Sequence, residues 1–398
     1  MSLSLPTPPD YEGAHLRHVM TSAASALGLQ GFENRLGLPA ANITVVLMVD
    51  GLGDALLARY SGHARFIASA WRQASRASVL DVGVPTTTAA SLASLGTGAT
   101  PGEHGLVGYD VLAPELDRVV NMLGGWDAEV DPVQWQPHAS VLQRAASAGA
   151  SVLTASRPKF AESQLTQAVL SGGDFTGAAR MDARFSRAAE WIAHQRPPKG
   201  AVRQGPAPKQ LIYLYVDELD KTGHRYGVAS PQWLQMLEML DAEAERFTAD
   251  LARRYGDQAS VLLTADHGMV DIAPEHRIDF SAREDLLAGV RHTGGEPRLV
   301  QLYAQPDAEP GEIAAAWIEE FGDRAWVLTK TEACAAGWFG PVQERVAGRI
   351  GDVLVAAHSD MALFHTDRVG TGPLEMVGQH GSLTEAERRV PLVRLSGA

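Results

Sequence analysis

The stretch ITVVLMVD, residues 43–50, is an apolar and β-branched run that ends at a carboxylate. Two later stretches share this design: QLIYLYVDELD at 210–220 and SVLLTADHG at 260–268. Near-continuous apolar runs of this length are typical of strands that are buried on both faces in a parallel sheet. The three stretches therefore predict a buried, mostly parallel sheet in which acidic residues follow the strands.

Helical patterns separate these strands. The longest, PQWLQMLEMLDAEAERFTADLARRYG at 231–256, carries one apolar stripe of helical period. The stripe consists of Leu234, Leu237, Leu240, Ala244, Phe247 and Leu251. Alternation of strand and helix predicts an α/β fold with a doubly wound sheet and helices on both of its faces. Residues 186–209 are rich in proline, glycine and basic residues, which predicts an exposed connection.

Residues 285–345 have a different pattern, in which two predicted strands flank one predicted helix. These elements are EPRLVQLYAQ at 296–305, PGEIAAAWIEEFG at 310–322 and DRAWVLTK at 323–330. We therefore expect a small α+β insertion, or cap, over a core formed by residues 1–284 and 346–398.

The composition, with 398 residues of which 45% are hydrophobic and 20% charged, is that of a globular protein. The formal net charge of −13 argues against nucleic acid as a general partner, because no basic excess is present to displace counterions from a phosphate backbone. No apolar stretch approaches the roughly 18 residues that span a bilayer, and the N-terminus lacks the pattern of a secretory signal. Cys334, the only cysteine, cannot form an intramolecular disulfide. These features favour a cytoplasmic enzyme without a membrane partner.

Aspartates and histidines gather at the ends of the predicted strands and in small-residue loops. They are Asp50, Asp220, His224, Asp266, His267 and His380. The spacing of Asp220 and His224 puts both on one face of a helix, or Gly223 brings them together in a tight loop. Ligands of open α/β sheets bind outside the carboxyl ends of the strands, so we expect one shared site. Six oxygen and nitrogen donors suit two zinc or manganese ions better than calcium.

The threonines of PTTTAASLASLGTG, residues 85–98, allow two interpretations. A threonine is a favoured helix cap, because its oxygen accepts a hydrogen bond from the first turn. Alternatively, one hydroxyl lies at the positive end of a helix dipole and acts as a nucleophile. Both interpretations stay open at the level of the residues alone.

Taken together, four ordered motifs resemble the alkaline phosphatase superfamily, and within it the type I phosphodiesterase / nucleotide pyrophosphatase family. The motifs are VDGLG, TTTAASLASLGTG, DELDKTGH with TADHG, and GQHGSLT. The resemblance covers roughly residues 42–110, 210–280 and 350–395 and implies an alkaline-phosphatase-like fold. It assigns Thr88 as the nucleophile, with Thr87 as the alternative if the register shifts by one.

The resemblance also implies two bound divalent metal ions, either zinc or manganese. One ion is assigned to Asp50, Asp266 and His267 with Thr88, and the other to Asp220, His224 and His380. Two divalent ions, three carboxylates and an ionised threonine leave a near-neutral site. This balance favours a phosphodiester or pyrophosphate bond over a more highly charged monoester.

The chain departs from the better-known nucleotide pyrophosphatases at two places. Ala89, Ala90 and Ser91 replace the family's Phe-Pro-Asn after the nucleophile, and Tyr109 replaces an asparagine that holds a phosphoryl oxygen. A phenol donates the same kind of hydrogen bond. Tyr109 and Ser91 are therefore the predicted substrate contacts. Arg157, Lys159 and Arg298 are further candidates, for which solvated surface charge is the favoured interpretation.

The sequence thus predicts a two-metal phosphohydrolase that forms a covalent phosphothreonine at Thr88. Its partner is a small phosphorylated substrate, with a nucleotide as one candidate. The alternatives are a phosphomonoesterase or phosphonate hydrolase on the same site, and an inactive metal-stabilised binding protein.

Overall fold

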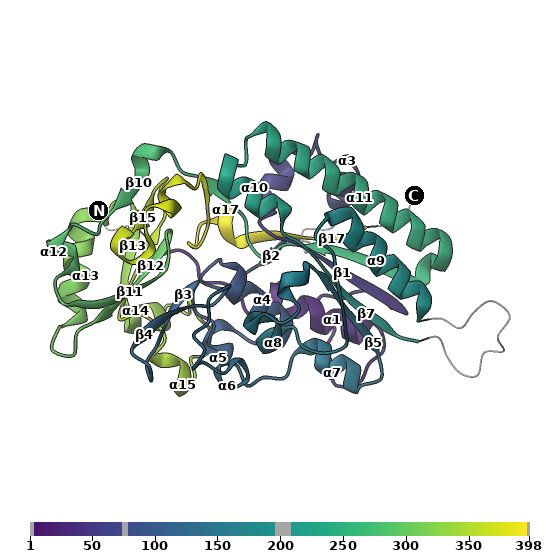
Figure 1. Cartoon of the computed structure of the whole chain (residues 1–398), viewed down its shortest axis with the longest axis horizontal. Coiled ribbons are helices and arrows are strands. Elements are labelled where there is room, and N and C mark those ends of the chain that lie inside the picture. The colour runs from purple at the N-terminus through teal and green to yellow at the C-terminus, as the bar shows by residue number, and fades with distance from the viewer. Residues whose placement is uncertain (1–3, 74–78, 196–207, 396–398) are drawn as a thin grey trace.

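The computed structural model describes residues 4–73, 79–195 and 208–395. Its central feature is a seven-stranded sheet (Figure 1). In order, the strands are β2 (Val79–Asp81), β17 (Arg389–Leu395), β8 (Ala259–Thr264), β1 (Ile43–Val49), β7 (Gln210–Val216), β5 (Ser151–Ser156) and β6 (Asp174–Gly177). From β8 to β6 all neighbours are parallel, whereas β17 runs antiparallel to β8 and β2. The three strands predicted from the sequence are therefore confirmed, and they lie side by side in the middle of the sheet.

Helices cover both faces of this sheet (Figure 1). On one face lie α3 (Arg65–Gln73), α9 (Met181–His194), α10 (Glu218–Tyr226) and α11 (Pro231–Tyr255). On the other face lie α1 (Val19–Ala26), α4 (Thr88–Thr97), α7 (Val141–Ser147) and α8 (Gln164–Val169). The predicted helix at 231–256 is α11, which buries Leu237, Leu240 and Phe247 of its apolar stripe. The predicted doubly wound α/β fold is confirmed.

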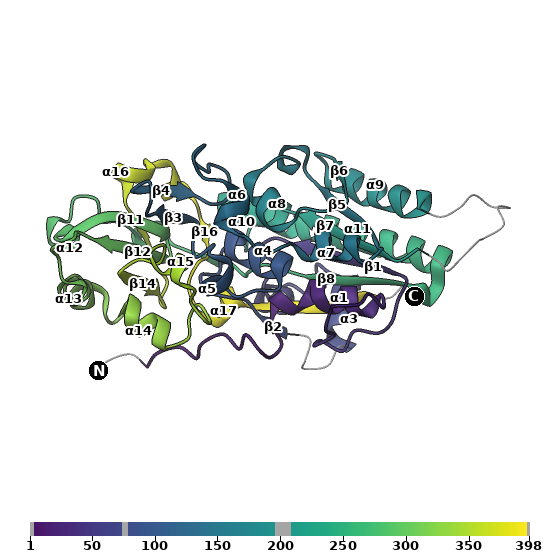
Figure 2. The same ribbon diagram turned by 90° about the horizontal axis from the view of Figure 1, so that it is seen from below.

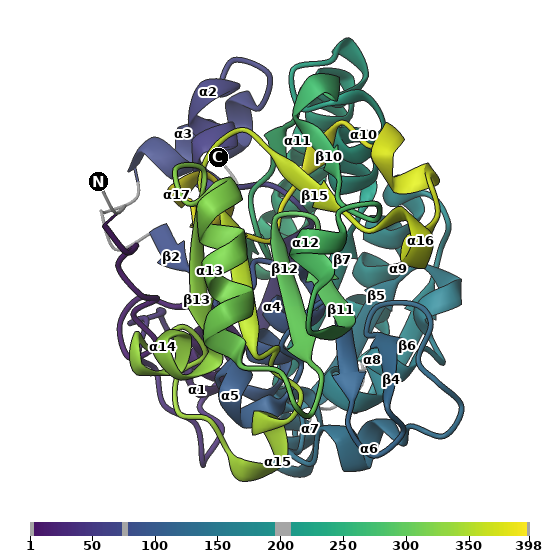
Figure 3. The same cartoon turned by 90° about the vertical axis from the view of Figure 1, so that its left-hand side faces the viewer.

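A second, antiparallel sheet lies beside the first along the long axis of the molecule (Figure 2). In order, its strands are β13 (Ala325–Thr329), β14 (Val353–Ala357), β12 (Leu299–Ala304), β11 (Val290–Glu296), β3 (Asp110–Ala113) and β4 (Arg118–Asn121). Helix α13 (Pro310–Phe321) packs on its outer face through Ile313 and Trp317 (Figure 3). The two strands and the helix predicted between 296 and 330 are thus confirmed.

The segment 285–345 supplies only part of the second sheet. It contributes β11, β12 and β13, whereas β3, β4 and β14 come from the segments predicted as core. The division of the chain into a core and an insertion stays a prediction about folding units. The sheet itself is built from both.

Short elements complete the described fold. The short ladders pair β10 (Arg277–Asp279) with β15 (Ala362–Phe364) and β9 (Val270–Asp271) with β16 (Gly378–Gln379). The short helices are α2 (Asp54–Arg59), α5 (Pro101–His104), α6 (Pro132–Trp135), α12 (Glu284–Leu287), α14 (Lys330–Ala335), α15 (Glu344–Ala347), α16 (Thr366–Val369) and α17 (Glu385–Arg388).

The exposed connection predicted at 186–209 is wrong in its first part. Residues 186–194 continue α9, because Ala188 and Ile192 extend the buried stripe of that helix. Residues 196–207 lie outside the described residues.

A buried ion pair joins the second sheet to the core. Arg298, in the turn between β11 and β12, donates through Nε and Nη2 to the two oxygens of Glu387 in α17, each at 2.8 Å. Its Nη1 donates to the carbonyls of Met361 and Ser359 at 2.7 and 2.8 Å. Neither side chain is more than 2% exposed. Neither sequence-based interpretation of Arg298, substrate contact or solvated surface charge, is correct.

We expect Arg298→Met to lower the free energy of unfolding by about 3–5 kcal/mol, because it leaves the Glu387 carboxylate buried without its partner. Urea denaturation followed by circular dichroism measures this loss. Arg246→Met is the matched control, since Arg246 is 69% exposed and, among the described residues, its ion pair is with Glu243 of its own helix. That control is expected to change stability by at most about 0.5 kcal/mol. Equal effects of the two substitutions would contradict a structural role for the buried pair.

Candidate active site

The three consecutive threonines take different positions at the start of α4. Thr88 is the first residue of the helix, and Thr87 precedes it without a side-chain capping hydrogen bond. Thr86 donates to the Ser382 carbonyl at 2.8 Å and accepts from the Gly381 N–H at 3.0 Å. The capping interpretation is therefore wrong for this run. Instead, the Thr88 hydroxyl lies buried, 3.2 Å from Nε2 of His267.

The aspartates that follow neighbouring strands meet at one edge of the central sheet. Asp50 follows β1, and Asp266 and His267 follow β8. Asp220 and His224 lie in α10, directly after β7, with Asp220 Oδ1 3.2 Å from His224 Nε2. The helical spacing, and not a tight loop, is what brings this last pair together. Because β8, β1 and β7 are adjacent and parallel, their carboxyl ends converge on one site.

Two groups of side chains in this site have the spacing of metal ligands. One consists of Asp50, Asp266 and His267, and the other of Asp220, His267 and His380; within each group the donor atoms lie within 4.8 Å of one another. His224 adjoins the second group through Asp220, and its ring centroid is 5.2 Å from that of His380. The six predicted ligands are thus gathered in one place, with His267 between the two groups.

Three buried carboxylate oxygens in the cluster accept no hydrogen bond from the residues that the structure describes. A histidine Nε2 lies 3.3 Å from Asp50 Oδ1, 3.2 Å from Asp220 Oδ1 and 3.7 Å from Asp266 Oδ2. Ligands at about 2.1 Å from a tetrahedral zinc ion are separated by about 3.4 Å. These spacings fit divalent cations bound between the atoms. Such cations would also offset the free-energy cost of burying carboxylates without a partner.

Backbone carbonyls orient all three histidines. Nδ1 of His224, His267 and His380 lies 2.7, 3.0 and 2.8 Å from the carbonyls of Gly378, Gly268 and Thr86. A carbonyl only accepts, so each Nδ1 must carry the hydrogen. Nε2 is then free to act as a ligand, which is the arrangement usual for metal-binding histidines.

The surroundings of Asp50 and His267 raise the pKa of both groups. Burial, together with the carboxylates of Asp220 and Asp266, raises the pKa of Asp50 well above its ordinary value. Burial alone would lower the pKa of His267, but Asp266 and Asp50 outweigh it and raise this pKa to about 10. Excess negative charge is thus balanced by protons, which divalent cations would displace.

A network of ion pairs holds the first turn of α10. Arg157 donates to Asp217 at 2.5 Å and to Glu218 at 3.0 Å, and buried Arg184 donates to Glu218 at 2.6 Å. Lys221 also pairs with Asp217. Arg157 is therefore neither a free surface charge nor an available substrate contact. It fixes the helix that carries Asp220.

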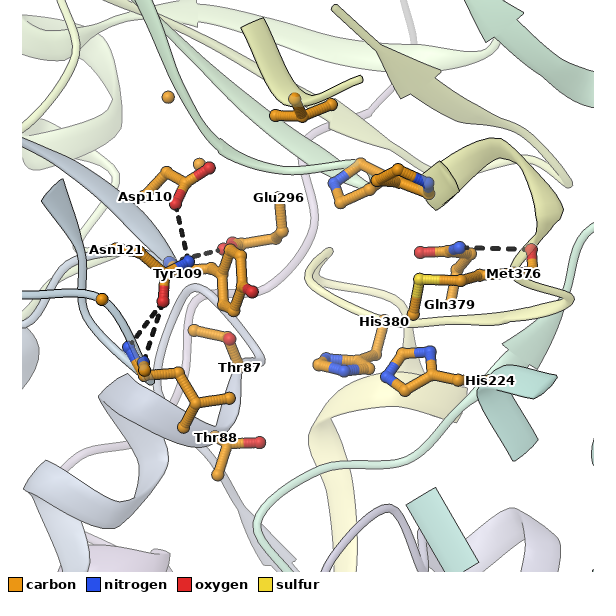
Figure 4. Close-up of a pocket in the computed structure, with 18 of the residues that line it drawn as sticks. Thr87, Thr88, Tyr109, Asp110, Asn121, His224, Glu296, Met376, Gln379 and His380 are labelled. Atoms are coloured by element: carbon orange, nitrogen blue, oxygen red, sulfur yellow. Dashed lines mark hydrogen bonds between the residues drawn. The ribbon is translucent and has the colours of Figure 1, made fainter. Parts of the chain in front are cut away.

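A cavity of about 820 Å³ opens over the cluster. Thr87, Thr88, His224 and His380 face it from one side, and the ring of Tyr109 projects into it (Figure 4). Lys159 also lines the cavity, whereas Ser91 does not. The Ser91 hydroxyl is buried and has no hydrogen-bond partner in the part of the chain that the structure describes. Of the two predicted substrate contacts, the cavity therefore includes Tyr109 alone.

Glu296, at the end of β11, is a cavity residue that the sequence reasoning missed (Figure 4). Its Oε2 accepts from the Tyr109 N–H at 2.9 Å, and its buried Oε1 has no hydrogen-bond partner within the described ranges of the chain. Burial raises its pKa well above the ordinary value. A side chain at Gly381 would place its Cβ 2.3 Å from Glu296 Cγ, so glycine is required beside His380. In the sequence, the signal that could have pointed to Glu296 is the pair of glycines directly before it, Gly294 and Gly295.

A protein-family model matches most of the chain. The model of the family described as type I phosphodiesterase / nucleotide pyrophosphatase matches residues 44–383. Human ectonucleotide pyrophosphatase/phosphodiesterase family member 7 is 36% identical over 63 residues, which are 16% of this chain and 14% of that protein. GPI ethanolamine phosphate transferase 1 of Aspergillus oryzae is 36% identical over 64 residues, or 16% and 6% of the two chains. The aligned segments thus span only a small part of these curated relatives.

Solved structures resemble the whole fold. Murine ectonucleotide pyrophosphatase / phosphodiesterase 5 has a TM-score of 0.69 and 16% identity, covering 89% of this chain and 88% of that chain. Phosphonoacetate hydrolase from Sinorhizobium meliloti 1021, in complex with phosphonoformate, has a TM-score of 0.66 and 18% identity, covering 90% and 91%. At these identities the likeness concerns the fold.

Among the described residues, no helix combines the length and apolar content that crossing a bilayer requires.

Proposed function

The chain belongs to the type I phosphodiesterase / nucleotide pyrophosphatase family, and we propose that it is a two-metal phosphohydrolase that cleaves phosphodiester or pyrophosphate bonds. The observation that carries this proposal is the set of three buried, unpartnered carboxylate oxygens that lie beside histidine nitrogens and the Thr88 hydroxyl. A cluster that only stabilised the fold would gain by pairing these oxygens. Their free state supports a role in holding cations.

Two divalent ions, zinc or manganese, are proposed as cofactors. Asp50, Asp266 and His267 would hold one ion, with Thr88 beside it. His267 Nε2 lies 3.3 Å from an oxygen of Asp50, 3.7 Å from an oxygen of Asp266 and 3.2 Å from the Thr88 hydroxyl. Asp220, His224 and His380 would hold the other. When bound, such ions neutralise charge on a phosphoryl group and favour deprotonation of hydroxyls and water.

Thr88 is proposed as the nucleophile. Its Oγ1 would form a bond to phosphorus while the bond from phosphorus to the leaving oxygen breaks, and the leaving group takes up a proton. The enzyme then holds a phosphothreonine that still carries the second substituent of the diester. Water would then form a bond to the same phosphorus while the bond from phosphorus to Oγ1 breaks, and the threonine oxygen takes up the proton that the water loses. The product is the phosphate monoester of the second substituent. The position of Thr88 at the N-terminus of ten-residue α4 supports this role, since the helix dipole favours negative charge there.

The cavity supports a substrate larger than a phosphate monoester. A volume of about 820 Å³ falls in the range of pockets that enclose drug-sized ligands. Murine ectonucleotide pyrophosphatase / phosphodiesterase 5 has been solved as an inactive threonine-to-alanine variant in complex with AMP. By analogy, a phosphodiester or pyrophosphate of a nucleotide is the proposed kind of substrate.

The test compares hydrolysis of bis-p-nitrophenyl phosphate and p-nitrophenyl phosphate by the zinc-loaded protein. We expect the diester to have the higher kcat/KM by at least about tenfold, because the site balances one substrate charge better than two. Preference for the monoester would replace the proposal with a phosphomonoesterase. No turnover of either ester, with zinc or with manganese, would favour the inactive binding protein.

A further inference from the structure

The cavity has a second wall that the proposed chemistry does not use. Thr88 and the aspartate–histidine cluster form one side of the cavity. Another part of its wall consists of Asp110 in β3, Thr293 in β11 and Arg368 in α16. Asp110 and Thr293 belong to strands of the second sheet, and Arg368 donates hydrogen bonds to both of them. The reacting phosphoryl group and its non-reacting substituent therefore have distinct surfaces available.

Arg368 is held on this wall with part of its guanidinium unused. Nη1 donates to Asp110 Oδ2 at 2.6 Å, and Nε donates to Thr293 Oγ1 at 3.1 Å. A guanidinium has five N–H donors, and these bonds use two of them. Within the described part of the chain, Nη2 donates to no protein atom. Nη2 is thus available for charge-assisted hydrogen bonds to an oxyanion.

The partners of Arg368 are themselves fixed. Asp110 Oδ1 accepts from Asn121 Nδ2 at 2.9 Å, and Thr293 Oγ1 lies 2.8 Å from Nδ1 of His365. The Arg368 side chain is 28% exposed, which leaves room for a ligand. Because its orientation is set before binding, little conformational entropy remains to be lost.

The surroundings of Arg368 strengthen a contact with an anion. Phe280, Val300 and Phe364 line the same cavity. Apolar groups reduce the local dielectric constant, so a charge-assisted hydrogen bond is stronger there than in water. An apolar linker on the substrate would also pack against these side chains.

We propose that Arg368 forms a subsite for an oxyanion, a carboxylate or a phosphate, on the non-reacting substituent of the substrate. This inference rests on the proposed phosphodiesterase function. It narrows the substrate class to phosphodiesters or pyrophosphates that carry a further anionic group beyond the scissile bond.

The test uses synthetic p-nitrophenyl phosphodiesters that differ only in their second substituent. Linkers of two, four and six carbons end in a neutral hydroxyl, a carboxylate or a phosphate. For the zinc-loaded wild type we expect kcat/KM to rise about tenfold or more, at the best linker length, when an anionic end replaces the hydroxyl. The carboxylate and phosphate arms identify which oxyanion the subsite prefers. The preference is expected mainly in KM, because the subsite is separate from the reacting atoms.

Arg368→Met is expected to abolish the preference, and Arg246→Met, which removes an exposed charge outside the cavity, to retain it. Melting temperatures confirm that the variants are folded. If the wild type hydrolyses neutral and anionic esters equally at every linker length, the inference is wrong whether or not the Met variant folds. A preference that survives in Arg368→Met also overturns it. Failure of the underlying function is distinct, since then no member of the series, neutral or anionic, releases p-nitrophenol.

Discussion

Replacement of Thr88 by alanine is expected to lower kcat for bis-p-nitrophenyl phosphate by about 10⁴-fold or more, the scale on which loss of a nucleophile acts. The Thr88 hydroxyl is buried at the start of α4, 3.2 Å from His267 Nε2. Two other hydroxyl-bearing residues line the cavity beside the cluster: its neighbour Thr87, and Tyr215, whose hydroxyl donates to Asp50. Steady-state kinetics of the zinc-loaded variant measures the loss, and elemental analysis is expected to find unchanged metal content.

Two matched variants separate the nucleophile from its surroundings. Thr88→Ser keeps a hydroxyl and is expected to retain most of the activity that Thr88→Ala loses. Thr87→Ala tests the alternative register and is expected to lower kcat less than about tenfold, a loss of about 1.4 kcal/mol. High activity in Thr88→Ala together with loss in Thr87→Ala would move the nucleophile to Thr87.

The second large effect is expected from Asp220→Asn, which keeps the shape of the side chain but removes its charge. Asp220 lies 3.2 Å from His224 Nε2 and 3.8 Å from His380 Nε2, and its Oδ1 is among the unpartnered oxygens. Loss of this carboxylate is expected to weaken zinc binding at one site by at least about 100-fold, the upper range found for residues that merely support metal ligands. Competition with a chromophoric chelator measures the affinity, and elemental analysis measures the number of ions per chain.

Asp217→Asn is the control for this experiment. Asp217 is an aspartate of the same turn, but Arg157 and Lys221 pair with it. Its substitution is expected to lower stability while two zinc ions remain bound. Retention of two tightly bound ions by Asp220→Asn would contradict the proposed ligand set.

Much of the site follows from the sequence because the decisive signals are local. Strand β1 reads as a run of apolar and β-branched residues, and Asp50 follows it directly, so both the strand and the first residue of the site are visible in eight residues. The spacing of Asp220 and His224 likewise fixes their common face once α10 forms. For these residues, prediction needs only the rule that parallel strands end at one edge.

The remaining residues depend on contacts between distant segments. Glu296 accepts from Tyr109, 187 positions away, and Arg368 pairs with Asp110 across 258 positions. Nothing in the residues around Arg298 indicates that Glu387 neutralises it inside the protein. A basic residue in a predicted loop is usually solvated. The burial of Arg298 is therefore visible only in the folded structure, where it pairs with Glu387.

The covalent intermediate at Thr88 is tested most directly by the stereochemical course at phosphorus. A phosphorothioate diester of known configuration is hydrolysed in ¹⁸O-labelled water by the zinc-loaded enzyme, and the configuration of the product is determined. Attack by Thr88 followed by attack of water inverts phosphorus twice, so the account predicts net retention. Net inversion would mean that water attacks the substrate directly, and would contradict a nucleophilic role for Thr88.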